Sequence, residues 1–250
     1  MESKQIIINK TLISYVAAGR GDKSLIFLHG WRSNKEVWLP IAHLMENAGY
    51  RLIFIDLPSF GASEQPKKPY TLHDYAETVR IFTKKLELKI HAVIGHSAGA
   101  RVAIKLAAEH PDLFKKLVLI ASGGNRPAFI TLKAALDKIT KPFFIPRFMA
   151  PLRAIIYKTL GADDYLATPE LTATFVNIIN ENLDSLFPRI KNDTLIIWGD
   201  VDTTAPLAYG KRMARLIPNA SLKIIKGAGH YCVSEQPEKC IALLEKHIAV

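Results

Sequence analysis

Short apolar runs of strand length alternate with helical segments along most of this chain, and this alternation limits the fold more than any other feature. The apolar runs are Ser24 to Leu28, Arg51 to Leu57, Ile90 to Ile94, Lys116 to Ala121, Thr194 to Trp198 and Ser221 to Ile225. The helical segments are Asn34 to Glu46, Thr71 to Leu88, Ala98 to Glu109, a stretch near Leu207 to Leu216, and Pro237 to Ile248. Continuous apolar strands that alternate with helices indicate a parallel sheet covered on both faces. Two further strands, Lys4 to Asn9 and Thr11 to Ala17, precede them. We therefore expect an α/β protein with a mostly parallel eight-stranded sheet flanked by helices.

The alternation stops after Ser122-Gly123-Gly124 and resumes at Thr194. Between these points the helical segments are cut by prolines and are rich in aromatic residues from Phe129 to Phe187, and no strand candidate stands out. We predict a core made of residues 1–124 and 192–250, with a helical cap, residues 125–191, inserted after the sixth strand.

Composition excludes several classes of protein. The net charge is +10, but the lysines and arginines are scattered over helix ends and faces, which argues against nucleic acid as a partner. No apolar stretch is long enough to span a bilayer, and the polar start does not resemble a signal peptide. Cys232 and Cys240 offer neither a disulfide framework nor metal-ligand spacing. We expect a cytoplasmic protein without a metal or other cofactor; the sequence leaves its oligomeric state open.

The segment from Val93 to Gly99 reads V-I-G-H-S-A-G and places Ser97 between a strand and a helix. The five-residue pattern is weak by itself, but a strand–serine–helix context is the one that exposes a serine nucleophile at a sharp turn. Gly95 and Gly99 are expected because side chains at those positions would collide in such a turn. The start of the following helix offers free N–H groups that suit an oxyanion.

A serine hydroxyl needs a base to take its proton, and His230 is the best candidate among the eight histidines. It follows the strand Ser221 to Ile225, at the sheet edge where ligands bind in α/β proteins. His29 ends a strand too, and with Gly30 it is expected to shape a loop. His96 is expected to pack inside. The remaining histidines are interpreted as surface or helix positions: His43, His73, His91, His110 and His247.

A carboxylate must fix the tautomer of that base. Asp200 and Asp202 both follow a late strand, and Asp56 follows another. The order serine, aspartate, histidine fits this type of fold. Physical reasoning on the residues alone does not separate Asp200 from Asp202.

Five motifs in order make the chain resemble the α/β-hydrolase fold family, of the cap-bearing serine esterase type. They are His29-Gly30-Trp31, Asp56 to Ser63 (D-L-P-S-F-G-A-S), Gly95 to Gly99 (G-H-S-A-G), Trp198 to Pro206 (W-G-D-V-D-T-T-A-P) and Gly229-His230. The resemblance implies that Asp202 is the triad acid and that Asp200 shapes the turn. It also implies an oxyanion hole formed by the backbone N–H groups of Trp31 and Ala98.

The resemblance implies a carboxylesterase-like enzyme. Ser97 would attack a small-molecule ester with a small or medium acyl chain, or an aryl ester, and form an acyl-enzyme. Lactones, thioesters and carbon–carbon bonds remain alternative targets for the same triad. A small-molecule receptor that retains the triad is an alternative of a different class. Fast turnover of chromogenic esters would distinguish the enzyme from the receptor.

Overall fold

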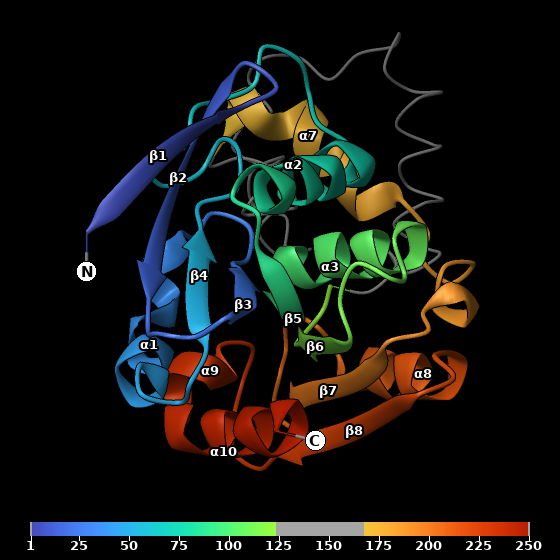
Figure 1. The fold of residues 1–250 in the computed structure, drawn as a ribbon. Helices are drawn as coiled ribbons and strands as arrows, with labels where there is room; N and C mark the ends of the chain where they lie inside the picture. The colour runs from blue at the N-terminus through green and yellow to red at the C-terminus, as the bar shows by residue number, and fades with distance from the viewer. Residues whose placement is uncertain (1, 124–167, 250) are drawn as a thin grey trace, which may run out of the picture.

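The computed structural model describes residues 2–123 and 168–249, and an eight-stranded sheet runs through them (Figure 1). The strands are β1 (Ser3–Ile8), β2 (Thr11–Ala18), β3 (Lys23–Leu28), β4 (Arg51–Ile55), β5 (Lys89–His96), β6 (Lys116–Ile120), β7 (Asp193–Gly199) and β8 (Ala220–Ile225). Their order in the sheet is β1-β2-β4-β3-β5-β6-β7-β8. Strand β2 is antiparallel to β1 and to β4, and all other neighbours are parallel. The predicted mostly parallel eight-stranded sheet is confirmed.

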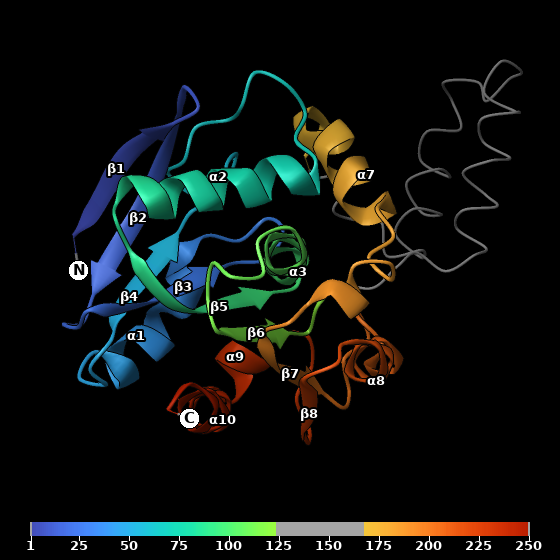
Figure 2. The same ribbon diagram turned by 45° about the vertical axis from the view of Figure 1, so that its right-hand side comes forward.

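Helices cover both faces of the sheet, as the continuous apolar strands predict (Figure 2). One layer contains α2 (Leu72–Lys85), α3 (Ala98–Glu109) and α8 (Leu207–Leu216), and the other contains α1 (Leu39–Met45), α9 (Cys232–Glu235) and α10 (Pro237–Ile248). Successive residues of a strand face opposite layers: Ile26 and Leu28 pack toward the first, Leu25 and Phe27 toward the second. Each fully buried large apolar side chain contributes about 1.5–3 kcal/mol.

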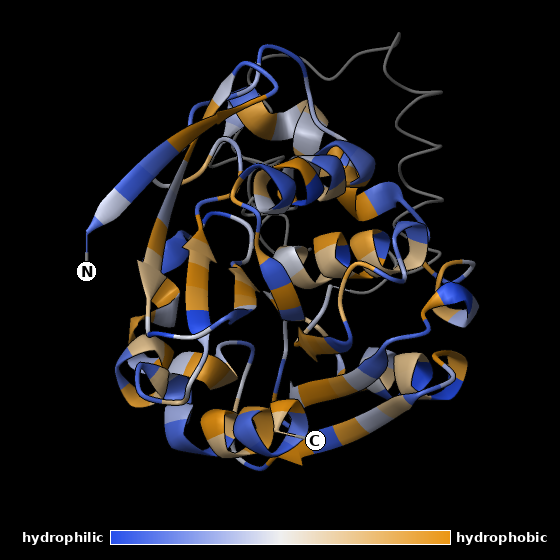
Figure 3. Cartoon of the chain, viewed as in Figure 1, coloured by the Kyte–Doolittle hydropathy of each residue, from blue (hydrophilic) through white to orange (hydrophobic). Residues whose placement is uncertain are grey.

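The hydropathy of each element matches its place in the fold (Figure 3). The central strands β3 to β6 are largely apolar, and β6 is buried over its whole length. The edge strand β1 is mostly exposed, and its first half is polar. Helix α2 carries both kinds of residue and begins with a capping box between Thr71 and Asp74. The sequence marked both residues as the start of this helix.

Three local expectations differ from the structure. The helix expected from Asn34 to Glu46 is a 3-10 helix, η1 (Lys35–Trp38), followed by α1, because Pro40 lacks the N–H that a continuous helix would need there. The short helix α9 was not expected. His91, interpreted as a surface or helix position, is buried in β5, where its Nε2 bonds to the carbonyl of Ile248 over 2.8 Å.

Only the last part of the predicted cap, residues 125–191, falls within the described residues. From residue 168 to residue 191 it contains η3 (Pro169–Leu171), α7 (Thr172–Asn180) and η4 (Phe187–Arg189), and no strand is present in this part. The rest of the predicted cap lies outside the described residues. In Figure 2, α7 lies near the first turn of α2 and beside α3. Among residues 2–123 and 168–249, no helix is long and apolar enough to cross a membrane.

Candidate active site

Ser97 lies at the sharp turn between β5 and α3, with backbone angles of φ 51° and ψ −112°. Such angles in a residue other than glycine cost about 1–3 kcal/mol and persist only where the surroundings enforce them. The Ser97 amide donates to the carbonyl of Ile120 over 3.0 Å, and the Ser97 carbonyl accepts from the amides of Ala100 at 3.1 Å and Arg101 at 3.3 Å. These bonds hold the strained turn at the end of the sheet.

Gly95 and Gly99 permit the close approach of backbone around this turn. A Cβ on Gly95 would lie 2.5 Å from the carbonyl oxygen of Gly99. A Cβ on Gly99 would lie 2.2 Å from the carbonyl oxygen of Leu28, in the neighbouring strand β3. Both contacts are with backbone, which cannot move aside without distorting the sheet. The two glycines therefore allow α3 to start directly against the sheet.

His230 lies between Ser97 and Asp202. Its Nε2 is 3.0 Å from Oγ of Ser97, and its Nδ1 is 2.9 Å from Oδ2 of Asp202. The three residues come from loops after β5, β7 and β8, whose carboxyl ends meet at one edge of the sheet. This arrangement allows the imidazole to take a proton from the serine while the carboxylate holds its other nitrogen.

Hydrogen bonds keep Asp202 ionised although its side chain is fully buried. Burial alone would raise the pKa of this carboxyl group, but hydrogen bonds from His230 and from the amides of Ala205 and Thr204 outweigh it, so the pKa lies below its usual value. Both amides donate to Oδ1 over 2.8 Å, which leaves Oδ2 for the imidazole. The carboxylate can thus stabilise a positive charge on His230.

The two other candidate acids lie in different contacts. Oδ1 of Asp200 accepts from the amide of Gly227 over 2.7 Å and so links the loops after β7 and β8. Asp56 is fully buried and accepts from the Lys35 amide at 2.7 Å, from Nζ of Lys35 at 2.6 Å and from the Ala62 amide at 2.9 Å. Neither has an interaction with His230 among the described contacts.

His29 and His96 are neutral, buried imidazoles near the site. Burial lowers the pKa of each to about 4. His29 donates from Nδ1 to the Gly30 carbonyl over 2.7 Å and accepts at Nε2 from the Leu57 amide over 3.0 Å, so it fixes the loop after β3. His96 donates from Nε2 to the backbone carbonyl of His230 over 2.9 Å. The sequence assigned His96 to packing alone, and its bond to the His230 loop was missed.

The groups expected to bind an oxyanion lie on two elements beside Ser97. Ala98 is the first residue of α3, where a backbone N–H has no intrahelical partner. Trp31 follows Gly30, and a Cβ on Gly30 would lie only 3.3 Å from Cβ of Ser97. The loop after β3 therefore lies directly against the serine.

Aromatic rings surround this loop. The ring of Trp31 packs edge-on against Phe60 and at a tilt against Phe175 of α7, with centroid distances of 4.9 Å in both pairs. Tyr231 packs edge-on against His230 at 5.3 Å, and it is 55% exposed. The sequence gave no sign of these pairings, because their members are far apart along the chain or belong to a segment rich in aromatic residues.

Two other features do not coincide with Ser97. A cavity of about 600 Å³ lies between the end of α2 and the loop after α3, and its lining includes Lys84, Glu87 and Pro111 but none of Ser97, Asp202 and His230. Within residues 2–123 and 168–249, no group of three or more His, Cys, Asp or Glu side chains is placed to hold a metal ion.

Comparison with known proteins adds evidence from whole chains. A model of the alpha/beta hydrolase family matches residues 25–243. An uncharacterised hydrolase, YugF, of Bacillus subtilis is 26% identical over 92% of this chain and 89% of its own length. A 2-hydroxy-6-oxononadienedioate/2-hydroxy-6-oxononatrienedioate hydrolase of a Pseudomonas species is 26% identical over 93% and 90%. The crystal structure of a membrane phospholipase A, a bacterial virulence factor, is similar with a TM-score of 0.80 and 25% identity, over 99% of this chain and 86% of that one.

Proposed function

Because this chain belongs to the alpha/beta hydrolase family, we propose that it is a serine hydrolase that cleaves carboxylic esters with small or medium acyl groups, or aryl esters. The observation that carries the proposal is the continuous contact from Ser97 through His230 to Asp202, over 3.0 Å and 2.9 Å. These distances suit direct proton transfer between serine and imidazole.

In the first half of the reaction, Oγ of Ser97 attacks the ester carbonyl carbon while Nε2 of His230 takes the hydroxyl proton. The resulting imidazolium is stabilised by ionised Asp202 at Nδ1. The negative oxygen of the tetrahedral intermediate is held by the N–H groups of Trp31 and Ala98. One such donor is worth about 3–4 kcal/mol.

The intermediate then breaks the bond between the carbonyl carbon and the alcohol oxygen, and His230 returns its proton to the leaving alcohol. An acyl group remains on Ser97. Water attacks this acyl-enzyme, with His230 again taking a proton, and the carboxylic acid leaves as Ser97 is regenerated. The mechanism uses the side chains and backbone of this protein and water.

A second candidate is hydrolysis of a carbon–carbon bond. The relative named as a hydrolase of 2-hydroxy-6-oxononadienedioate favours it, since that compound is a keto acid rather than an ester. Here Ser97 would attack a ketone carbonyl, and the leaving carbon would be protonated. The phospholipase likeness favours the ester instead. Lactones, thioesters and a receptor with slow hydrolysis are outcomes of the same assay.

The test is stopped-flow hydrolysis of p-nitrophenyl esters from acetate to octanoate, alongside a 2-hydroxy-6-oxodienoate, a lactone and a thioester. We expect a burst of one nitrophenol for each chain, followed by steady turnover. A fluorophosphonate should label Ser97 in the wild type and not in Ser97→Ala. Fast cleavage of the dienoate with slow ester cleavage would favour the second candidate. A single slow turnover would favour the receptor. Undiminished ester turnover by Ser97→Ala would contradict the mechanism.

A further inference from the structure

Arg101 is a buried arginine on α3, four residues after Ser97, and only 2% of its surface is exposed. Its guanidinium donates from Nε and Nη2 to the carbonyl of Ile178, over 3.2 Å and 2.9 Å. It also donates from Nη2 to the carbonyl of Glu181 over 2.6 Å and from Nη1 to that of Gly123 over 2.9 Å. One side chain therefore joins three backbone carbonyls that are distant in sequence.

Two of these carbonyls belong to the carboxyl end of α7 (Thr172–Asn180). Carbonyls in the last turn of a helix have no intrahelical N–H to accept from, and the helix dipole makes this end negative. A guanidinium suits the position because its planar fork can serve several oxygens at once. Burial lowers the pKa of Arg101 to about 10, so the side chain stays charged at neutral pH.

The third carbonyl connects the nucleophile turn to the same clamp. Gly123 lies just after β6, and its amide is 3.5 Å from the carbonyl of Ser97. The amide of Arg101 donates to that Ser97 carbonyl as well. The guanidinium thus joins α7 to the backbone that holds the strained serine.

The other contacts of α7 lead to the loop beside the serine. Phe175 packs on Trp31, at a centroid distance of 4.9 Å. Thr174 accepts from the Tyr70 amide over 3.1 Å, and Asn177 donates to the Tyr70 carbonyl over 3.2 Å. A shift of α7 along or about its axis would therefore move Phe175 relative to Trp31.

We propose that Arg101 is a positioning residue for substrate selectivity: it clamps the end of α7 to the nucleophile helix and thereby holds Phe175 against Trp31 as a wall beside the reacting carbonyl. The selectivity part rests on the proposed ester hydrolysis. The wall restricts the larger acyl groups, because the N–H of Trp31 is one of the two groups assigned to the oxyanion. Loosening the clamp favours larger acyl groups over acetate.

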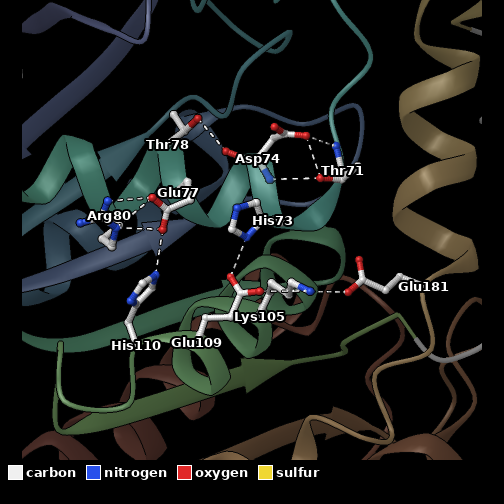
Figure 4. A network of polar contacts seen from close by, with 10 residues as sticks. All are labelled: Thr71, His73, Asp74, Glu77, Thr78, Arg80, Lys105, Glu109, His110 and Glu181. Carbon is white, nitrogen blue, oxygen red and sulfur yellow. Dashed lines mark hydrogen bonds and ion pairs between the residues drawn. The ribbon is translucent and has the colours of Figure 1, made fainter.

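A nearby ion pair is the weaker link between the same elements. Nζ of Lys105 lies 2.7 Å from Glu181 and 3.2 Å from Glu109, within a network that joins α2, α3 and the residue after α7 (Figure 4). The side chains of Lys105 and Glu181 are 15% and 28% exposed, so solvent screens this pair. Arg101 is buried and reaches the backbone itself, which fixes α7 more directly.

The experiment compares Arg101→Met and Arg101→Lys with a matched control, Arg80→Met. Arg80 pairs with Glu77 on α2. Amide hydrogen exchange of a peptide covering residues 172–181 reports the clamp without any substrate. We expect exchange at least about tenfold faster in Arg101→Met, a smaller increase in Arg101→Lys, and no change in Arg80→Met. Unchanged exchange in both Arg101 variants would overturn the clamp, whatever the ester assays give. If Arg101→Met does not fold, Arg101→Lys decides.

Selectivity is measured as the ratio of kcat/KM for p-nitrophenyl butyrate to that for the acetate. We expect Arg101→Met and Phe175→Ala each to raise this ratio about tenfold, the scale of discrimination by pocket contacts. In the double variant the ratio should equal that of Phe175→Ala, because Arg101 acts through Phe175. Multiplying effects, or an unchanged ratio in Arg101→Met, would overturn the selectivity role. If the wild type cleaves neither ester, the proposed function fails, whereas the exchange result still decides the clamp.

Discussion

Nε2 of His96 donates a hydrogen bond to the backbone carbonyl of His230 over 2.9 Å, in a site where both side chains are largely buried. The bond joins the end of β5 to the loop after β8, across 134 residues of sequence. His96 immediately precedes Ser97, so it sets the distance between the nucleophile turn and the base. His96 is thus a positioning residue for the proposed reaction.

Replacing His96 should therefore lower kcat more than it changes KM. In His96→Ala the buried carbonyl of His230 loses its donor, which costs about 1–3 kcal/mol and lets the imidazole move from Ser97. We expect a loss of about 10- to 100-fold in kcat, with partial rescue in His96→Gln, which keeps a donor. Steady-state kinetics on one chromogenic ester, with urea unfolding of each variant, provides the measurement. Equal losses of activity in the alanine and glutamine variants would argue against this role.

The pair Asp200 and Asp202 offers a matched comparison in one loop. Asp202→Asn removes the charge that stabilises the imidazolium and permits the wrong tautomer, so kcat should fall about 10⁴-fold. Asp200→Asn alters only the contact with the Gly227 amide, and we expect less than about a fivefold loss, in line with the modest worth of an exposed hydrogen bond. Activity of both proteins on the same ester is the readout. A larger loss in Asp200→Asn would reassign the acid.

The sequence predicts the sheet and the nucleophile turn well because both depend on local patterns. The apolar strands and the glycines two residues on either side of Ser97 are constraints that short stretches must meet themselves. The choice between Asp200 and Asp202 is different. It depends on which carboxylate faces a loop 28 residues further along, and only the family resemblance pointed to Asp202 before the structure placed it at His230.

Contacts that cross the insertion could not be predicted in the same way. Arg101 is a lone charge on an otherwise apolar stretch of helix, and this was the one available sign of a buried role. Its partners Ile178 and Glu181 contribute backbone carbonyls, which have no sequence signature. The four-residue helix α9 is similarly too short for a periodic pattern.

Two substitutions at Ser97 separate its chemistry from its backbone strain. Ser97→Ala should lower kcat by on the order of 10⁶, as loss of a serine nucleophile does in other hydrolases, while keeping the strained φ of 51°. Ser97→Gly should be equally inactive but more stable than Ser97→Ala by about 1 kcal/mol, because glycine adopts this conformation without strain. Thermal unfolding of the two proteins measures the difference. A glycine variant less stable than the alanine variant would show that the turn is not strained.

Protein stability should fall as the pH is lowered from 7 to 4.5, because His29 and His96 are buried as neutral imidazoles. Their pKa of about 4 in the folded protein lies below the ordinary value of 6.5, so between these values the unfolded chain binds more protons and acid favours unfolding. A shift of this size corresponds to about 3 kcal/mol for each group when it is complete. Urea unfolding at several pH values tests this, and His96→Gln should remove about half of the slope. Since the pKa of Glu77 is lowered to about 2, its ionisation changes mainly below this range. A free energy of unfolding that stays constant from pH 7 to pH 4.5 would mean that the two imidazoles can be protonated inside the folded protein.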